Sequence, residues 1–208
     1  MASIRLASVT IFNTPLIRSL FRYCALRYLK LQGWRLCGEI PAARRYVIIA
    51  APHTSNWDLP MTLAVVFAFN LKVHFLAKHT LFIFPFGALM RWLGGIPVNR
   101  TSAHNFVEQA VDLFSQHEEL ILIVPPEGTR QKVRYWKSGF YYIAQGAGVP
   151  IVLGFIDFKR KLAGFGGEFI PTGSYEADIG EIQQFYSGIT GKNPGLTSEI
   201  QIERPDSP

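Results

Sequence analysis

The sequence predicts an α/β fold, in which a largely parallel β-sheet is flanked by helices and a basic amphipathic helix lies at the N-terminus. Two observations support this prediction. Short apolar runs rich in β-branched residues recur along the chain, and segments of helical periodicity, each about ten residues or longer, separate them. A chain of 208 residues is also long enough for one domain with a full hydrophobic core. We therefore expect βα units with helices on both faces of the sheet.

The N-terminal part begins with a helix and continues into two strands. Apolar residues recur at helical spacing over residues 15–31, and residues 33–36 suit a short strand before a turn at 40–45. Residues 46–52 (YVIIAAP) are apolar, contain β-branched side chains and end at a proline. We expect a buried strand there.

The middle of the chain alternates between helices and extended segments. Residues 59–70 suit a helix, because Ser55 and Asn56 can cap its start and Pro60 falls in its first turn. The elements expected after it are a strand at 72–77, a helix at 86–95 that ends in a glycine pair, and an extended piece at 96–100.

The C-terminal half repeats this alternation. Its expected elements are a helix at 103–117, a buried strand over 120–128 that runs into a Pro-Glu-Gly turn, a helix at 135–146 and a strand at 149–158. From Gly164 onward the tail is richer in glycine and turns, and a helix over 176–189 is the last expected element.

Residues 1–45 carry the whole cationic excess of the protein. They hold eight basic side chains and one acid, which gives +7, whereas the full chain has a net charge of +6. The remaining 163 residues therefore sum to −1. A basic segment of this kind favours an anionic surface, either a nucleic acid or a membrane, and helical periodicity favours the membrane.

The expected N-terminal helix has an apolar stripe and basic residues away from it. The stripe consists of Leu16, Ile17, Leu20, Phe21, Cys24, Tyr28 and Leu31, and the basic residues are Arg18, Arg22 and Lys30. Such a helix can lie in a membrane interface with its arginines near phosphates, or it can pack its stripe on the core with the basic residues in solvent. We divide the chain into a membrane-associating segment at 1–32 and an α/β domain at 33–208.

Composition and cysteine spacing exclude several classes of protein. Hydrophobic residues make up 49% and charged residues 17%, which excludes a disordered chain. No segment reaches the roughly 18 uncharged apolar residues of a membrane span, and the N-terminus does not read as a signal peptide. We expect no metal site, because no suitable ligand spacing is found at Cys24, Cys37, His74, His79, His104 or His117.

Polar residues follow three of the expected strands or extended pieces. His53 follows the strand at 46–52, Arg100 ends the piece at 96–100, and the run from Glu127 to Arg130 follows the third strand. Because ligands of open α/β sheets bind at the carboxyl ends of the strands, we expect these residues to form one site.

His53 and Asp58 can form a catalytic pair only if the chain turns between them. Five residues along a helix correspond to about 140° of rotation, so the two side chains would diverge on a straight helix. An aspartate bound to one imidazole nitrogen leaves the other nitrogen free as a base that can take a proton from an attacking hydroxyl. The alternative is that His53 and Asp58 separately cap a strand end and a helix.

Arg100 and Arg130 suggest a substrate that carries a phosphate. Guanidinium groups bind phosphate through two hydrogen bonds, and an arginine at a strand end near a histidine is well placed for that role. The alternative is a structural ion pair with Glu127 or another acid. Neither a phosphate-binding P-loop nor a nucleophilic serine or cysteine near His53 is evident, so we expect direct, base-assisted transfer.

Four ordered motifs resemble those of the glycerolipid acyltransferase superfamily. They are HTSNWD at 53–58, GGIPVNR at 94–100, PEGTR at 126–130 and VPIV at 149–152. This family contains the 1-acylglycerol-3-phosphate acyltransferases and their lysophospholipid relatives, and the chain looks like a short, bacterial-type member. Lys78 and the Lys137-Ser138-Gly139 step also fit the family.

The resemblance implies a role for each matching residue. His53 would be the general base and Asp58 would orient it. Arg100 and Arg130 would hold the acceptor phosphate, and Pro150 would form a wall near the acyl chain. The remaining substrate-binding residues would be Lys78, Glu127, Gly128, Thr129 and Lys137.

The same resemblance implies the partners and the location of the protein. The acyl donor would be acyl-CoA or an acyl-carrier protein, with no further cofactor, no metal and no nucleic acid. The protein would act peripherally at the cytoplasmic face of the inner membrane, on membrane lipid.

The motifs also depart from the family pattern. Pro125 replaces a common aromatic, Asn99 a frequent acid and Leu153 a frequent proline, and these departures concern the acceptor more than the catalytic groups. Three alternatives stay open: another acceptor, a catalytically idle lipid-binding protein, and a hydrolase that uses water with the same pair.

Overall fold

The computed structural model describes residues 6–98, 103–198 and 200, and within them it confirms the α/β fold with one seven-stranded sheet. The strand order is β1-β7-β6-β2-β5-β3-β4. The strands are β1 (Arg35–Cys37), β2 (Arg45–Ala51), β3 (Val73–Lys78), β4 (Gly95–Val98), β5 (Leu120–Val124), β6 (Ile151–Asp157) and β7 (Leu162–Phe169). The run from β6 to β4 is parallel throughout, whereas β7 is antiparallel to β6 and parallel to β1.

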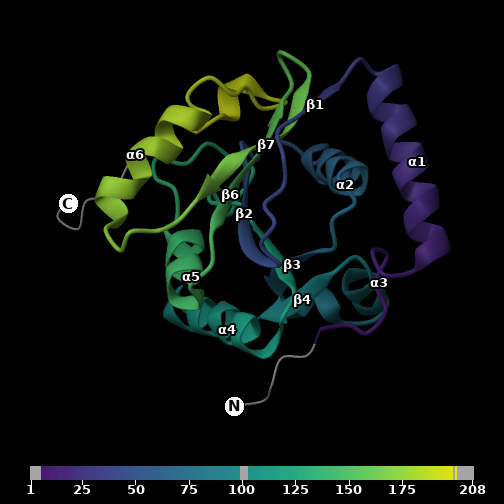
Figure 1. Cartoon of the computed structure of the whole chain (residues 1–208), viewed down its shortest axis with the longest axis horizontal. Helices are drawn as coiled ribbons and strands as arrows, with labels where there is room; N and C mark the ends of the chain where they lie inside the picture. The colour runs from purple at the N-terminus through teal and green to yellow at the C-terminus, as the bar shows by residue number, and fades with distance from the viewer. Residues whose placement is uncertain (1–5, 99–102, 199, 201–208) are drawn as a thin grey trace.

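Helices cover both faces of this sheet (Figure 1). On one side lie α1 (Pro15–Leu31), α2 (Asp58–Ala68) and α3 (Gly87–Trp92), and on the other α4 (Ala103–Gln116), α5 (Gly139–Ala147) and α6 (Tyr175–Tyr186). Two short 3-10 turns, η1 (His79–Phe82) and η2 (Pro194–Leu196), complete the described elements.

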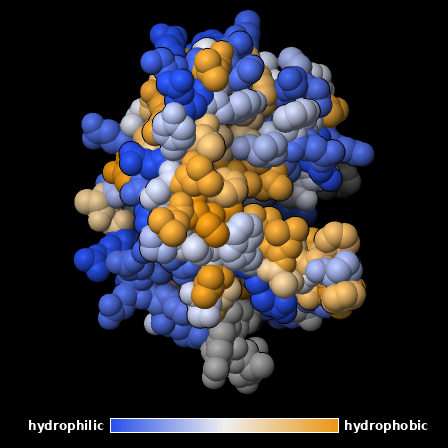
Figure 2. Space-filling view, turned by 90° about the vertical axis from the view of Figure 1, so that its right-hand side faces the viewer, coloured by the Kyte–Doolittle hydropathy of each residue, from blue (hydrophilic) through white to orange (hydrophobic). Residues whose placement is uncertain are grey.

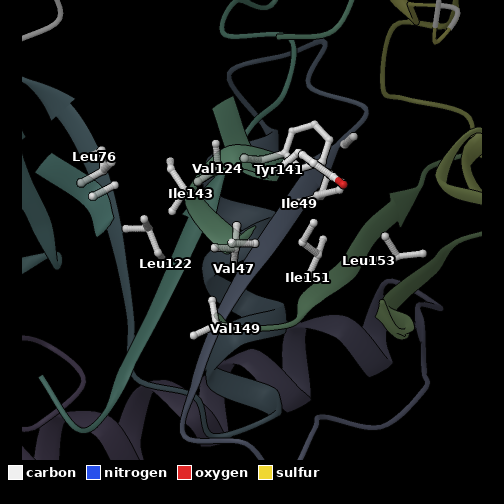
Figure 3. Close-up of a cluster of buried hydrophobic side chains, with 14 of the residues drawn as sticks. Val47, Ile49, Leu76, Leu122, Val124, Tyr141, Ile143, Val149, Ile151 and Leu153 are labelled. Carbon is white, nitrogen blue, oxygen red and sulfur yellow. The ribbon is translucent and has the colours of Figure 1, made fainter. Parts of the chain in front are cut away.

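Alternation along the central strands builds two separate hydrophobic layers. Val47 and Ile49 of β2 contribute to the layer beneath α4, α5 and α6, while Tyr46 and Ile48 contribute to the layer beneath α1 and α2. Side chains two residues apart on a strand point to the same face, so each central strand serves both layers. Figure 3 shows the first layer, where residues of β2, β5 and β6 meet Tyr141 and Ile143 of α5.

The expected elements are confirmed with small shifts, except for one strand that the sequence pattern hides. The glycine-rich segment after Gly164 was expected to form turns, but residues 162–169 form β7. A Cβ atom on Gly164 would overlap the carbonyl oxygen of Cys37 in β1, and one on Gly166 would overlap the ring of Phe185. Glycine is therefore required here by close packing rather than by a turn.

Helix α1 has the expected bounds, and it packs on α2 through a face that includes only part of its apolar stripe. Leu16 and Leu31 of the stripe are 86% and 78% exposed, whereas Ala25 and Leu29 are buried against α2. The arginines face the protein: the Arg18 guanidinium donates to the Asn70 carbonyl oxygen at 2.7 Å, and Arg22 to that of Ala68 at 3.5 Å.

These two carbonyls lie at the C-terminal end of α2, where the helix dipole is negative and favours cations. The stripe is therefore divided: Ile17 packs on the core and Phe21 against Phe67, whereas Leu16, Leu20 and Leu31 are left at the surface. Arg18 and Arg22 bond to the end of α2, and Arg22 stays exposed.

His74 in β3 makes stability depend on pH. Burial, together with the nearby His117, lowers the pKa of His74 from its ordinary value of 6.5 to about 4. Between these values the unfolded chain binds a proton that the folded protein does not, so stability is full above about pH 6.5 and decreases as the pH falls. We expect urea unfolding of His74→Gln to show a smaller loss between pH 7 and pH 5 than the unchanged protein.

His79→Gln is the matched control, because His79 is exposed. It should keep the original pH dependence. An identical loss in His74→Gln and in the unchanged protein would show that other groups cause it.

Candidate active site

His53 and Asp58 are brought together by a tight turn between β2 and α2. His53 lies two residues beyond the end of β2, and Asp58 is the first residue of α2. The Nδ1 atom of His53 is 3.2 Å from Oδ2 of Asp58. The same oxygen accepts hydrogen bonds from the N–H groups of Thr54 and Ser55, both at 2.7 Å.

The chain turns between His53 and Asp58, as their spacing requires if the two side chains are to meet. No helix runs straight through residues 53–58. The Asp58 carboxylate is buried, and the His53 side chain remains 29% exposed, so the ring can be reached from outside. Because Nδ1 faces the carboxylate, Nε2 is the nitrogen left for a substrate.

Glu127 lies directly behind this turn. It follows β5 and is only 2% exposed, and its Oε1 accepts a hydrogen bond from the backbone N–H of His53 at 3.1 Å. Its other oxygen, Oε2, has no hydrogen-bond partner among the described residues. Burial raises the pKa of Glu127 above its ordinary value of 4.5, although the bond from His53 opposes the shift.

Gly128, Thr129 and Arg130 of the third motif are at the surface. Gly128 has a positive φ of 65°, and a Cβ atom on it would be 3.1 Å from Nζ of Lys137, so the lysine side chain lies over this glycine. The backbone N–H of Lys137 donates to the Pro126 carbonyl at 2.9 Å, which holds the lysine beside the motif. Thr129 and Arg130 are exposed, and no ion pair joins Arg130 to Glu127.

The structure places the remaining predicted residues differently. Lys78 ends β3 and is exposed at the same edge of the sheet as His53. Arg100 lies outside the described residues. Pro150 precedes β6 and its carbonyl accepts from Val47 N–H, so it lies at the opposite edge and is not brought to His53.

A narrow apolar crevice opens beside His53 and Asp58 and runs between α2 and the sheet. Its walls include Thr62 and Val65 of α2, Phe155 of β6 and Phe165 of β7. The carboxyl half of β6, and not Pro150, lines this crevice. An apolar crevice that starts at His53 suits a substrate whose reactive group carries a hydrocarbon chain.

Sequence reasoning missed a clamp on the catalytic turn. The side-chain amide of Asn193 donates to the Thr54 carbonyl at 2.9 Å, and the Asn193 backbone N–H donates to Thr54 Oγ1 at 3.2 Å. Thr54 itself is buried. No local pattern around Asn193 could indicate this contact, because the partners are 139 positions apart.

The described ranges contain neither a metal-binding cluster nor a membrane-spanning helix. Among those residues, no three His, Cys, Asp or Glu side chains cluster closely enough to hold a metal ion. In the same part of the chain, no helix combines the length and the apolar character needed to cross a bilayer.

Comparisons with known proteins identify a family and a similar fold. A family model described as Acyltransferase matches residues 38–153, more than half of the chain. Among solved structures, the fold is similar to that of the 1-acyl-sn-glycerophosphate (LPA) acyltransferase PlsC from Thermotoga maritima. The TM-score is 0.54 at 21% identity, over 80% of this chain and 74% of that one. A comparison with curated proteins gives no match.

The buried carboxyl of Glu127 gives a prediction about stability. Its raised pKa means that the unfolded state releases this proton at a lower pH than the folded state does. Stability is therefore lost as the pH rises above 4.5 through the folded pKa. Glu127→Gln keeps an oxygen for the His53 N–H and removes the charge, so we expect a larger free energy of unfolding than wild type at pH 7.

Urea unfolding at several pH values measures this difference, which should shrink toward pH 4.5. Glu119→Gln, at an exposed carboxylate, is the control. If Glu127→Gln is less stable than the unchanged protein at pH 7, the buried charge is compensated by partners outside the described residues.

Proposed function

Because this chain belongs to the acyltransferase family, we propose that it transfers a fatty acyl group from an acyl thioester to the hydroxyl of a lysophospholipid-like acceptor. A 1-acylglycerol-3-phosphate is the reference acceptor, since the similar solved structure carries that activity in its name. The observation that carries the proposal is the single oxygen of Asp58, which holds both the turn and Nδ1 of His53.

The pair can perform the transfer directly, without a covalent enzyme intermediate. Nε2 of His53 takes the proton of the acceptor hydroxyl as that oxygen attacks the thioester carbonyl carbon. The tetrahedral intermediate then collapses, the carbon–sulfur bond breaks, and the sulfur leaves with the proton from His53. Asp58 keeps the imidazole in the tautomer with its proton on Nδ1 and stabilises the imidazolium between the two steps.

Exposed cations near the pair suit an acceptor with a phosphate. Arg130 ends the third motif, Lys137 lies over its Gly128 and Lys78 ends β3, all at the carboxyl edge of the sheet. None of these three forms an ion pair with a described carboxylate, so their charges are available to an anion. Arg100 joins them as a prediction from its motif alone.

We assign the acyl chain of the donor to the apolar crevice, which has a volume of only about 40 Å³, so α2 would have to move from the sheet to admit a fatty chain. The crevice begins at His53 and Asp58 and is lined by the apolar side chains of α2 and of the strands. A chain that enters it would place its thioester at the mouth, next to the base. The donor is acyl-CoA or an acyl-carrier protein.

The competing functions are less well supported. A catalytically idle lipid-binding protein would not need a histidine held by a buried aspartate, and a hydrolase would not need unpaired cations beside the base. An acceptor other than a glycerophosphate stays a second candidate, because Asn99, Pro125 and Leu153 depart from the family pattern.

Membrane association follows from the exposed stripe of α1. Leu16, Leu20 and Leu31 are at the surface, whereas Arg18 and Arg22 donate to carbonyls at the end of α2. Figure 2 shows hydrophobic side chains gathered on the side of the molecule where α1, α2 and α3 lie. We therefore infer a peripheral protein at the cytoplasmic face of the inner membrane, with α1 in the interface.

The base assignment is tested by His53→Ala. Loss of the proton acceptor should lower kcat for acyl transfer by about a hundredfold or more. The assay uses labelled acyl-CoA or acyl-carrier protein, a panel of lyso-lipids, and separate measurement of released free fatty acid. His79→Ala, at an exposed histidine outside the pair, is the control.

Acyl transfer that survives His53→Ala would refute the base assignment. Release of free fatty acid without acylation of any lyso-lipid would favour the hydrolase.

The role of α1 is tested by Leu16→Ser with Leu20→Ser. Both side chains are exposed, so the fold should be unaffected, and binding to phosphatidylglycerol-containing vesicles should fall about tenfold. Sedimentation with vesicles measures it. Point substitutions are preferred to truncation, because Ala25 and Leu29 of α1 belong to the core. Unchanged binding would reject this role.

A further inference from the structure

An exposed apolar segment links β3 to α3, and we call residues 81–89 the aromatic loop. Phe84 is 97% exposed, Ile83 68% and Phe86 65%, and Leu81 and Leu89 are also exposed. Single exposed apolar side chains are ordinary, but five within nine residues form a patch that calls for a partner.

The exposure of the aromatic loop is built into its structure. Phe82 at its start is buried, and the guanidinium carbon of Arg91 lies 5.3 Å from the centre of its ring. The Gly87 N–H donates to the Ile83 carbonyl at 2.9 Å, and a Cβ atom on Gly87 would overlap the Phe82 carbonyl oxygen. The loop is thus closed on itself around Phe82, and this closure presents Phe84 and Phe86 outward.

The charge around the aromatic loop suits an anionic surface. Between Asp58 and Glu108 the sequence contains no aspartate or glutamate at all. The lysines and arginines in the same stretch are Lys72, Lys78, Arg91 and Arg100. An acid-free basic stretch that carries an exposed aromatic tip combines the two features that anionic lipid surfaces select.

The position of the aromatic loop relates it to the catalytic pair and to α1. The loop follows Lys78, which ends β3 at the same edge of the sheet as His53. It leads into α3, which lies on the same face of the sheet as α1 and α2 (Figure 1). Trp57 and Leu59, next to Asp58, are exposed at this edge as well.

We propose that the aromatic loop is a second membrane anchor, which inserts Phe84 and Phe86 into the interfacial region of an anionic bilayer. Together with α1 it gives the protein two separate contacts with the lipid and fixes the edge that bears His53 against the membrane surface. The phenylalanine rings enter the boundary between headgroups and acyl chains, while Lys78 and Arg91 stay at the level of the phosphates. The inference rests on the proposed function in so far as the acceptor is a membrane lipid.

The test compares the unchanged protein with a full-length double variant that carries both Phe84→Ser and Phe86→Ser. Binding is measured by sedimentation with vesicles of phosphatidylethanolamine and phosphatidylglycerol, without donor or acceptor. We expect the partition coefficient to fall about tenfold or more, with an unchanged thermal unfolding midpoint. Ile170→Ser is the matched control: Ile170 is 71% exposed but lies outside the aromatic loop, and its loss should not alter binding.

A second variant reports insertion directly. Phe84→Trp should bind vesicles as the unchanged protein does, and its extra tryptophan emission should shift to shorter wavelength when vesicles are added. An emission that does not shift would overturn the proposal, even if the serine variant proved unstable.

Three results would contradict the second anchor. Equal vesicle binding of the serine variant and the unchanged protein would show that α1 acts alone. A dimer that dissociates on the serine substitutions, with vesicle binding unchanged, would show that a second copy covers the aromatic loop. Loss of binding only to an acyl-carrier protein would identify a protein partner instead.

The outcome is separable from that of the proposed function. A protein that binds vesicles through the aromatic loop but transfers no acyl group would refute the function and leave the anchor in place. If the protein transfers acyl groups and the serine variant binds vesicles as well as the unchanged protein does, only the anchor is refuted.

Discussion

The site depends on the acceptor capacity of one buried oxygen. Oδ2 of Asp58 accepts hydrogen bonds from the N–H groups of Thr54 and Ser55 and lies 3.2 Å from Nδ1 of His53. If the turn opened, this buried oxygen would lose its hydrogen-bond donors, which is costly. The same oxygen thus holds the turn and orients the His53 ring. Glu127 completes this support from the other side through the backbone of His53.

The fold was largely predictable because its signal is local. The apolar runs of β2, β5 and β6 and the helical periodicity of α1, α4 and α6 are properties of short windows, and parallel pairing follows from their alternation. β7 was not predictable in this way. Its glycines suggest turns, and only the closeness of Cys37 and Phe185, distant in sequence, explains why residues without side chains occupy a strand.

The candidate site also has features that local sequence predicts and features that depend on distant contacts. His53, Asp58 and Glu127 could be placed from their positions after strands, since parallel strands deliver their carboxyl ends to one edge. Pro150 was expected beside the acyl chain but precedes its strand, and the register of β6 puts Phe155 at the level of Ala51 instead. The sequence pattern also could not predict which side of α1 faces the protein. Arg18 and Arg22 donate to carbonyls at the end of α2, and the position of that end depends on the tertiary fold.

The clamp from Asn193 bears on what counts as the smallest working unit of this protein. The family match ends at residue 153, yet the catalytic turn is held by Asn193, and the hydroxyl of Tyr186 donates to the Gly154 carbonyl at 2.8 Å. β7, which lies beyond the match, also provides the pairing edges for β1 and β6. Residues 38–153 therefore contain the family motifs but do not form an independent structural unit. A fragment or fusion cut at those limits would carry the motifs without the contacts that hold them in register.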